Sequence, residues 1–195
     1  MVILIGLLTV SAPCRTNVLP HQLSASLKKI VLKNTDGKKD SLSAFALHRA
    51  TVFIFLSSEC PISNAYMPIL AVLISEFAKQ NIIFCGVIAD PDISSEQAKE
   101  FGSNYSFTSD ILMDPEHKLV LALTANVTPE VFVILGNGTI AYHGRIDDRY
   151  VALGKGRARA STNDLRDALI QISQGRKVAK PRTKVVGCSI PELRK

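Results

Sequence analysis

Residues 51–61, Thr-Val-Phe-Ile-Phe-Leu-Ser-Ser-Glu-Cys-Pro, carry the pattern that decides the fold. Their first part, 51–56, is β-branched, aromatic or aliphatic with no polar alternation, which is typical of a strand buried on both faces of an α/β sheet. Apolar residues then recur at helical spacing over 61–79. Pro61 suits the first helical turn, because an N–H there would have no intrahelical partner. The stretch therefore predicts a strand, a turn carrying Cys60, and a helix.

The neighbouring segments extend this unit into a sheet. The predicted strands are 28–33, 51–56, 81–88, 131–135 and 139–143, and the predicted helices are 61–79, 94–101, 116–123 and 162–174. Two buried strands joined by a helix imply a right-handed parallel crossover. The Gly-Asn-Gly sequence at 136–138 is a hairpin signal that adds antiparallel strands. The fold class predicted is α/β, with a mixed central sheet of about five strands flanked by helices.

Composition divides the 195 residues into one domain with extensions. The predicted domain is 26–175, and 176–195 reads as a basic tail. From residue 151 onward there are 11 Lys and Arg against 3 Asp and Glu, and no aromatic residue follows Tyr150. Base stacking on nucleic acid has no support, so no nucleic-acid partner is predicted. We interpret the excess charge as a solvated tail, with attachment to an anionic surface as the alternative.

The first residues suggest export. Residues 1–12 are apolar and uncharged, too short to span a bilayer as a helix, and similar to the core of a signal peptide. We therefore interpret 1–25 as an export segment and linker, which predicts a periplasmic or other extracytoplasmic location. The alternative is a cytoplasmic protein with a buried N-terminal strand. Membrane association is expected only if this segment is retained or Cys14 carries a lipid.

The metal-binding residue types show no ligand pattern. The cysteines form no closely spaced pair, so neither zinc nor a dense disulfide scaffold is expected. They are Cys14, Cys60, Cys85 and Cys188. His117 and His143 are isolated in the sequence and are interpreted as structural. We predict no metal and no cofactor.

Cys60 lies where chemistry is expected. It follows the carboxyl end of a central strand and precedes a helix, the edge at which open α/β sheets bind ligands. Unpaired N–H groups and the helix dipole stabilise a thiolate there and lower the thiol pKa. A purely structural cysteine is the competing interpretation.

Two motifs strengthen the reactive interpretation. Glu59-Cys-Pro-Ile-Ser-Asn64 and Thr128-Pro-Glu-Val-Phe132 resemble signatures of the redoxin branch of the thioredoxin-like superfamily, the alkyl hydroperoxide reductase and thiol-specific antioxidant (AhpC/TSA) group. Gly144-Arg-Ile-Asp-Asp148 and Gly187-Cys-Ser-Ile190 are similar to further segments of that group. The resemblance implies a thioredoxin-like fold and a thiol-dependent oxidoreductase with Cys60 as nucleophile. Its partners would be a protein thiol or disulfide, or a hydroperoxide, and an external thiol reductant.

The resemblance also implies a substrate-binding set. Pro129 corresponds to the cis-proline of thioredoxins, which packs against the active cysteine and exposes backbone to a substrate strand. The remaining members are Ser57, Pro61, Ser63 and Thr128. Ser63 replaces the second cysteine of Cys-x-x-Cys; its hydroxyl can bond the thiolate but cannot resolve a mixed disulfide.

Two alternatives remain open. A peroxiredoxin-like hydroperoxide reductase would need Pro-x-x-x-Thr-x-x-Cys; Ser57 can replace the Thr, but Phe53 occupies the Pro position. A non-catalytic thioredoxin-fold binding module would keep the lone Cys60 beside Ser63.

The other cysteines divide by context. Cys85 lies within an apolar strand and is interpreted as core. Cys188 lies in the polar C-terminal segment, which could reach back over the domain. A reversible disulfide with Cys60 is predicted, and an exposed cysteine with no partner is the alternative. Arg145, Asp147 and Asp148 form either a charged lip near Cys60 or a surface loop.

Overall fold

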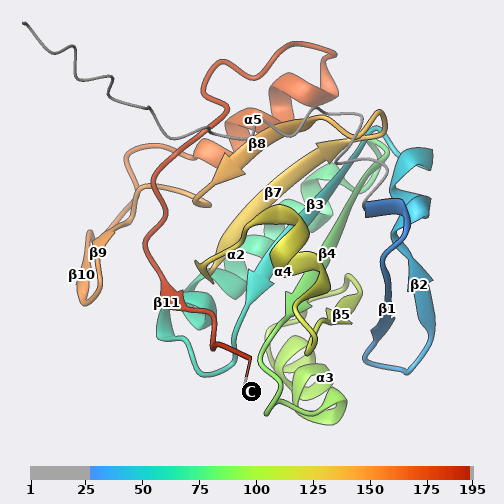
Figure 1. Ribbon diagram of the computed structural model, residues 1–195. Helices are drawn as coiled ribbons and strands as arrows, with labels where there is room; N and C mark the ends of the chain where they lie inside the picture. The colour runs from blue at the N-terminus through green and yellow to red at the C-terminus, as the bar shows by residue number, and fades with distance from the viewer. Residues whose placement is uncertain (1–26, 194–195) are drawn as a thin grey trace, which may run out of the picture.

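A seven-stranded mixed sheet forms the centre of the computed structural model, which describes residues 27–193 (Figure 1). The strand order is β2-β1-β5-β4-β3-β7-β8. The strands are β1 Val31–Asn34, β2 Lys39–Ser41, β3 Ala50–Leu56, β4 Ile82–Ile88, β5 Ile111–Met113, β7 Glu130–Leu135 and β8 Ile140–Gly144. Outside it lie two small pairs, β6 Val127–Thr128 with β11 Cys188–Ser189, and β9 Tyr150–Ala152 with β10 Lys155–Gly156.

The predicted sheet core is confirmed. Strands β3 and β4 pair in parallel, with Thr51 opposite Ile83, and β3 pairs antiparallel with β7. Strand β7 and its hairpin partner β8 are antiparallel, as the Gly-Asn-Gly turn predicted. The expected count of about five strands was low because β2 and β5 have three residues each, too few to show a periodic pattern.

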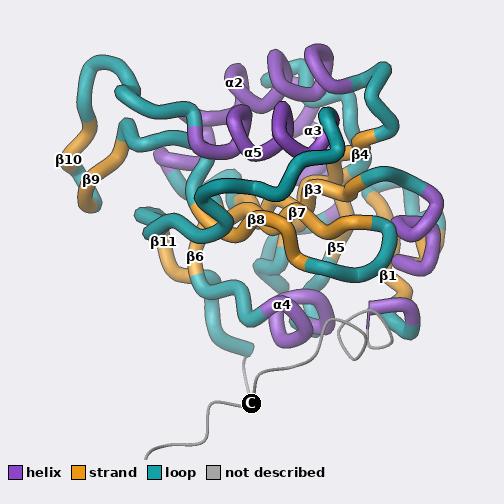
Figure 2. The backbone as a smooth tube through the Cα atoms, turned by 90° about the horizontal axis from the view of Figure 1, so that it is seen from above, coloured by secondary structure: helices purple, strands orange, loops and turns teal. Residues whose placement is uncertain are grey.

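Strand β3 is buried along its whole length, and its side chains alternate between two cores. Val52 and Ile54 face one core, and Phe53 and Phe55 face the other. Helices α2, α3 and α5 cover the first face and α4 covers the second (Figure 2). The helices are η1 Leu42–Leu47 (3-10), α2 Pro61–Phe77, α3 Ser95–Asn104, α4 Lys118–Leu123 and α5 Asp164–Ser173.

Some helix and strand ends differ from the bounds that the sequence predicts. Helix α3 begins with a capping box, in which the Ser94 hydroxyl accepts the Gln97 N–H. Residue 163 is the N-cap of α5, which is predicted from 162, and the Thr162 hydroxyl donates to the Asp164 carboxylate. The strand predicted at 28–33 begins only at Val31, because the chain before it turns.

The backbone of the segment after α5 packs along the sheet instead of extending away as a tail, although its Lys and Arg side chains at 176–184 are exposed. It descends beside β8 to β11 in Figure 1. The N–H of His143 donates to the Pro181 carbonyl at 2.9 Å, and the N–H of Thr183 donates to the His143 carbonyl at 3.1 Å. Val178 is buried among the residues of the first core. The edge strand thus gains a hydrogen-bonded cover.

The export segment predicted at 1–25 lies outside the described residues, and so does Cys14. Within 27–193, no helix combines the length and apolar character needed to cross a bilayer.

Candidate active site

Cys60 occupies the turn between β3 and α2. It is the N-cap of α2, with extended φ and ψ of −93° and 111°, and Pro61 begins the helix as expected. The Cys60 carbonyl accepts the N–H of Asn64 at 3.0 Å, while the side chain is only 1% exposed. The thiol therefore lies under a cover at the carboxyl edge of the central strand.

The loop before β7 supplies part of that cover. The Thr128–Pro129 peptide bond is cis, as the resemblance implied. The Thr128 carbonyl lies 3.1 Å from Cys60 Sγ and accepts its S–H. Thr128 also belongs to β6, and β11 is paired with β6 at the edge where another strand could otherwise be added.

Cys188 completes the cover. In β11 it is paired opposite Thr128, which brings its Sγ to 2.7 Å from Cys60 Sγ. Both cysteines are free thiols. Cys60 carries one proton and can donate to either Thr128 or Cys188, but not to both; once it ionises, Cys188 becomes the donor.

The pKa values of the two thiols are shifted in opposite directions. Burial opposes ionisation of Cys60, but hydrogen bonds from the Cys188 thiol and from the N–H groups of Ser63 and Cys188 outweigh it, with the Thr128 hydroxyl adding to them, so its pKa is lowered. Burial and the adjacent Cys60 sulfur raise the pKa of Cys188 to about 11. Of the two thiols, Cys60 is therefore the one that ionises first, and Cys188 then donates a hydrogen bond to it.

Ser57 and Ser63 shape the turn. The Ser57 hydroxyl accepts the N–H of Glu59 at 3.2 Å. The buried Ser63 hydroxyl accepts the N–H of Ser57 at 3.4 Å. The backbone of Ser63, rather than its hydroxyl, is the group that stabilises the Cys60 thiolate.

Sequence reasoning missed the support of the cis-proline loop. The Glu130 carboxylate accepts the N–H groups of Asn126 at 2.8 Å and Val127 at 3.3 Å. It also bonds His143 Nε2 at 2.6 Å, and the His143 ring stacks on Phe132. Glu130 directly follows Pro129 in a buried strand, and an acidic residue in that position is the signal that could have revealed its role.

His143 is thus a structural partner. The imidazole of His117, also considered as a ligand, bonds the Ala89 carbonyl at 2.9 Å. Among residues 27–193, no cluster of His, Cys, Asp and Glu side chains could hold a metal ion.

Neither of the two alternatives for the Arg145–Asp148 segment, a charged lip near Cys60 or a surface loop, describes its carboxylates. Asp147 is buried and accepts the Tyr66 hydroxyl, and Asp148 is buried and accepts the N–H groups of Ser161 and Thr162. Arg145 pairs with Asp164. These carboxylates stabilise the loop after β8, because each accepts hydrogen bonds from backbone N–H or hydroxyl groups.

Cys85 packs against the second core, as interpreted from its strand. Burial, together with Asp110 and Asp40, raises its pKa to about 12. A thiol with that pKa is a poor nucleophile near neutral pH.

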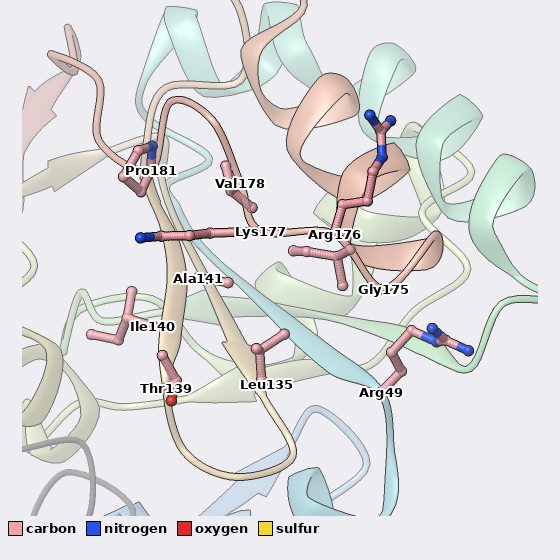
Figure 3. Close-up of a pocket in the computed structure, with 11 residues that line it drawn as sticks. Arg49, Leu135, Thr139, Ile140, Ala141, Gly175, Arg176, Lys177, Val178 and Pro181 are labelled. Atoms are coloured by element: carbon pink, nitrogen blue, oxygen red, sulfur yellow. The ribbon is translucent and has the colours of Figure 1, made fainter.

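A cavity of about 340 Å³ lies away from this chemistry. Figure 3 shows it between β8 and the segment after α5, with the apolar side chains of Leu135, Ile140 and Val178 along it. The guanidinium groups of Arg49 and Arg176 point in different directions there. Its lining includes no residue predicted for the redox site, so the cavity contributes nothing to the Cys60 chemistry.

Solved structures share this architecture. An uncharacterized conserved protein from Geobacillus kaustophilus has a TM-score of 0.77 at 22% identity, covering 85% of this chain and 89% of that one. A secreted Mycobacterium tuberculosis disulfide oxidoreductase homologous to E. coli DsbE has a TM-score of 0.56 at 16% identity, covering 77% and 98%. A mutant of Xanthomonas campestris peroxiredoxin Q has a TM-score of 0.53 at 20% identity, covering 61% and 81%.

The structural similarity establishes the thioredoxin-like fold and nothing more, because the sequence identities are low. No curated protein sequence matches the chain. The model of the AhpC/TSA family matches residues 24–143, which include Cys60 and Pro129 but not the segment that carries Cys188. The chain therefore belongs to the AhpC/TSA family.

Proposed function

We propose that this protein is a thiol-disulfide oxidoreductase in which Cys60 is the nucleophile and Cys188 the resolving thiol. The observation that carries the proposal is the contact between the two sulfurs, 2.7 Å apart with their pKa values shifted in opposite directions. A lowered pKa favours the thiolate of Cys60, the attacking form, and the raised pKa of Cys188 keeps the proton on the neighbouring sulfur.

The reaction has two exchange steps. The Cys60 thiolate attacks one sulfur of a substrate disulfide, and the other sulfur leaves as a thiolate that takes up a proton. Cys188 then loses its proton and attacks Cys60 Sγ, which expels the second substrate thiolate and forms the Cys60–Cys188 disulfide. An external thiol pair reduces that disulfide and is itself oxidised.

A hydroperoxide is the second candidate substrate. The contact with Cys188 supports it as well as it supports a disulfide, because Cys188 could resolve either intermediate on Cys60. Cys60 would take one oxygen to form a sulfenic acid with release of an alcohol, and Cys188 would displace water to form the same disulfide. Against it, no arginine hydrogen-bonds Cys60 among the described residues; the bonds are to Thr128 and Cys188. A non-catalytic binding module is disfavoured by the lowered pKa of Cys60.

The test compares turnover of bis(2-hydroxyethyl) disulfide and of an alkyl hydroperoxide by the reduced protein. Cys60→Ser should abolish turnover of the true substrate. Cys188→Ser should stop the reaction at a trapped Cys60 adduct, and Cys85→Ser should behave as wild type because the raised pKa of the partly buried Cys85 thiol keeps it protonated.

Peptide mapping without reductant completes the test. After one oxidative turnover, a Cys60–Cys188 peptide is expected. Unchanged turnover in Cys60→Ser would eliminate Cys60 as the nucleophile, and oxidation of Cys60 with no Cys188 cross-link would leave a one-cysteine mechanism.

A periplasmic or other extracytoplasmic location remains a proposal that rests on residues 1–12 alone. Fractionation of a cell that expresses the full chain, with N-terminal sequencing of the product, tests it. A cytoplasmic product with the original N-terminus would contradict it.

A further inference from the structure

The backbone beside the cis-proline is already paired with the chain itself. Thr128 lies opposite Cys188 and Val127 opposite Ser189 in antiparallel register. The N–H of Ile190 donates to the Asn126 carbonyl at 3.0 Å, which extends the pairing by one residue. An extended peptide that bound Cys60 by strand addition would need these same backbone groups.

Gly187 fits this strand against the cis peptide. A Cβ on Gly187 would lie 2.3 Å from the Thr128 carbonyl oxygen and 2.7 Å from its carbon. Both atoms are backbone and cannot rotate away, so only a residue without a side chain allows the approach. The contact is therefore specific to the sequence of the segment.

The strand is also anchored on both sides. Before it, the Thr183 hydroxyl bonds the Tyr142 hydroxyl at 2.8 Å and accepts the N–H of Arg145 at 2.9 Å. At its end, Ile190 packs against the second core. A reagent that needs the whole edge must break several bonds together, whereas a small one needs only a local opening at Cys188.

We propose that residues 187–190 are an internal substrate strand that restricts Cys60 to low-molecular-weight disulfides and excludes polypeptide disulfides. The inference rests on the proposed function and names its substrate class. The chemistry is unchanged: the Cys60 thiolate displaces one small thiolate, Cys188 displaces the other, and the external thiol pair reduces the resulting disulfide. Only a local opening at Cys188 is needed, because the two sulfurs lie in contact once the strand closes again.

The first test uses Gly187→Val, which pushes the strand off Thr128. Its matched control is Lys184→Val, an exposed residue of the same segment. Initial rates are measured with bis(2-hydroxyethyl) disulfide and with insulin, in excess dithiothreitol so that resolution does not depend on Cys188. The ratio of the insulin rate to the small-disulfide rate should rise about tenfold or more in Gly187→Val, given several lost backbone bonds, and should not change in the control.

The second test measures how accessible Cys60 is beneath residues 187–190 and does not depend on enzyme activity. Labelling of Cys60 by iodoacetamide and by a polyethylene-glycol maleimide is followed by peptide mapping. The bulky reagent should lag far behind in wild type and in Lys184→Val, and the lag should shrink in Gly187→Val. If that variant does not fold, Thr183→Ala, which removes the upstream anchor, is expected to act in the same direction.

The outcomes separate two failures. Equal bulky labelling in wild type and Gly187→Val, or a wild type that reduces insulin as fast as the small disulfide, overturns the internal strand. Full small-disulfide turnover by Cys60→Ser overturns the proposed function, while the labelling result still reports on the strand.

Discussion

Replacing Glu130 tests whether one buried carboxylate holds the cis-proline loop in place. Its side chain is 5% exposed and accepts two backbone N–H groups, at 2.8 and 3.3 Å, besides bonding His143. A hydrogen bond to a charged group contributes about 1.5–3 kcal/mol, and the longer bond falls at or below the low end of that range. Glu130→Ala should therefore lower the free energy of unfolding by about 3 kcal/mol.

For a chain of this size, that loss corresponds to a fall in Tm of about 6–12 °C. Glu130→Gln keeps an oxygen for the two N–H groups and should cost about 1 kcal/mol, the net worth of an uncharged bond. Urea unfolding at constant pH measures both variants. The formation rate of the Cys60–Cys188 disulfide should fall in Glu130→Ala, because β6 positions β11.

The control is Glu116→Ala, whose carboxylate is 71% exposed in a surface pair with Lys118. It should change stability by no more than about 0.5 kcal/mol. A Glu130→Ala protein within about 1 kcal/mol of wild type would refute the assigned role, since the loop bonds would then be worth no more than a surface contact.

Two pH experiments follow from the same structure. In Cys188→Ala, alkylation of Cys60 by iodoacetamide should reach half its maximal rate at a higher pH than in wild type, because a lowering hydrogen bond is lost while burial remains; an unmoved profile would contradict this. Burial raises the pKa of Asp164, but bonds from Lys180, Arg145 and Thr162 outweigh it and lower the net value. Asp164→Asn should therefore destabilise the protein by about 2–3 kcal/mol at pH 7, as expected for a buried carboxylate with charged partners. A group with a lowered folded pKa contributes stability above its unfolded pKa of about 3.9 and loses it as pH falls through the folded value, so wild type and variant should converge in acid; a difference that persists there would exclude the linkage.

Much of the site could be predicted because its signals are local. An apolar run with no polar alternation can only be a buried strand or helix, and the six residues of 51–56 are too few for a helix of ordinary length. The position of Cys60 at the first turn of α2 follows from Pro61, whose fixed φ and missing N–H suit a helix start. Strand β3, helix α2 and the position of Cys60 between them could be predicted for these reasons.

The structure alone shows what pairs across the sequence. The charge composition after residue 151 predicted a solvated tail. Composition carries no information on tertiary contacts, such as those of Thr183 with β8 and of Gly187 with the cis peptide. The carboxylates of Asp147 and Asp148 were expected at a surface, yet each lies buried among donors that only the folded loop assembles.

Cys60 and Cys188 show the division between the two kinds of information. The sequence by itself determined which cysteine follows a central strand and begins a helix, because dihedral preferences and hydrophobic periodicity act over a few residues. Only the tertiary structure decided that Cys188 lies 2.7 Å away, because that contact depends on the register of β11 against Thr128, 60 residues distant in the chain. A register shift of one residue would turn the Cys188 side chain to the opposite face of its strand. The sequence could therefore suggest the Cys60–Cys188 pair, but the contact between the sulfurs depends on the packing of the whole segment.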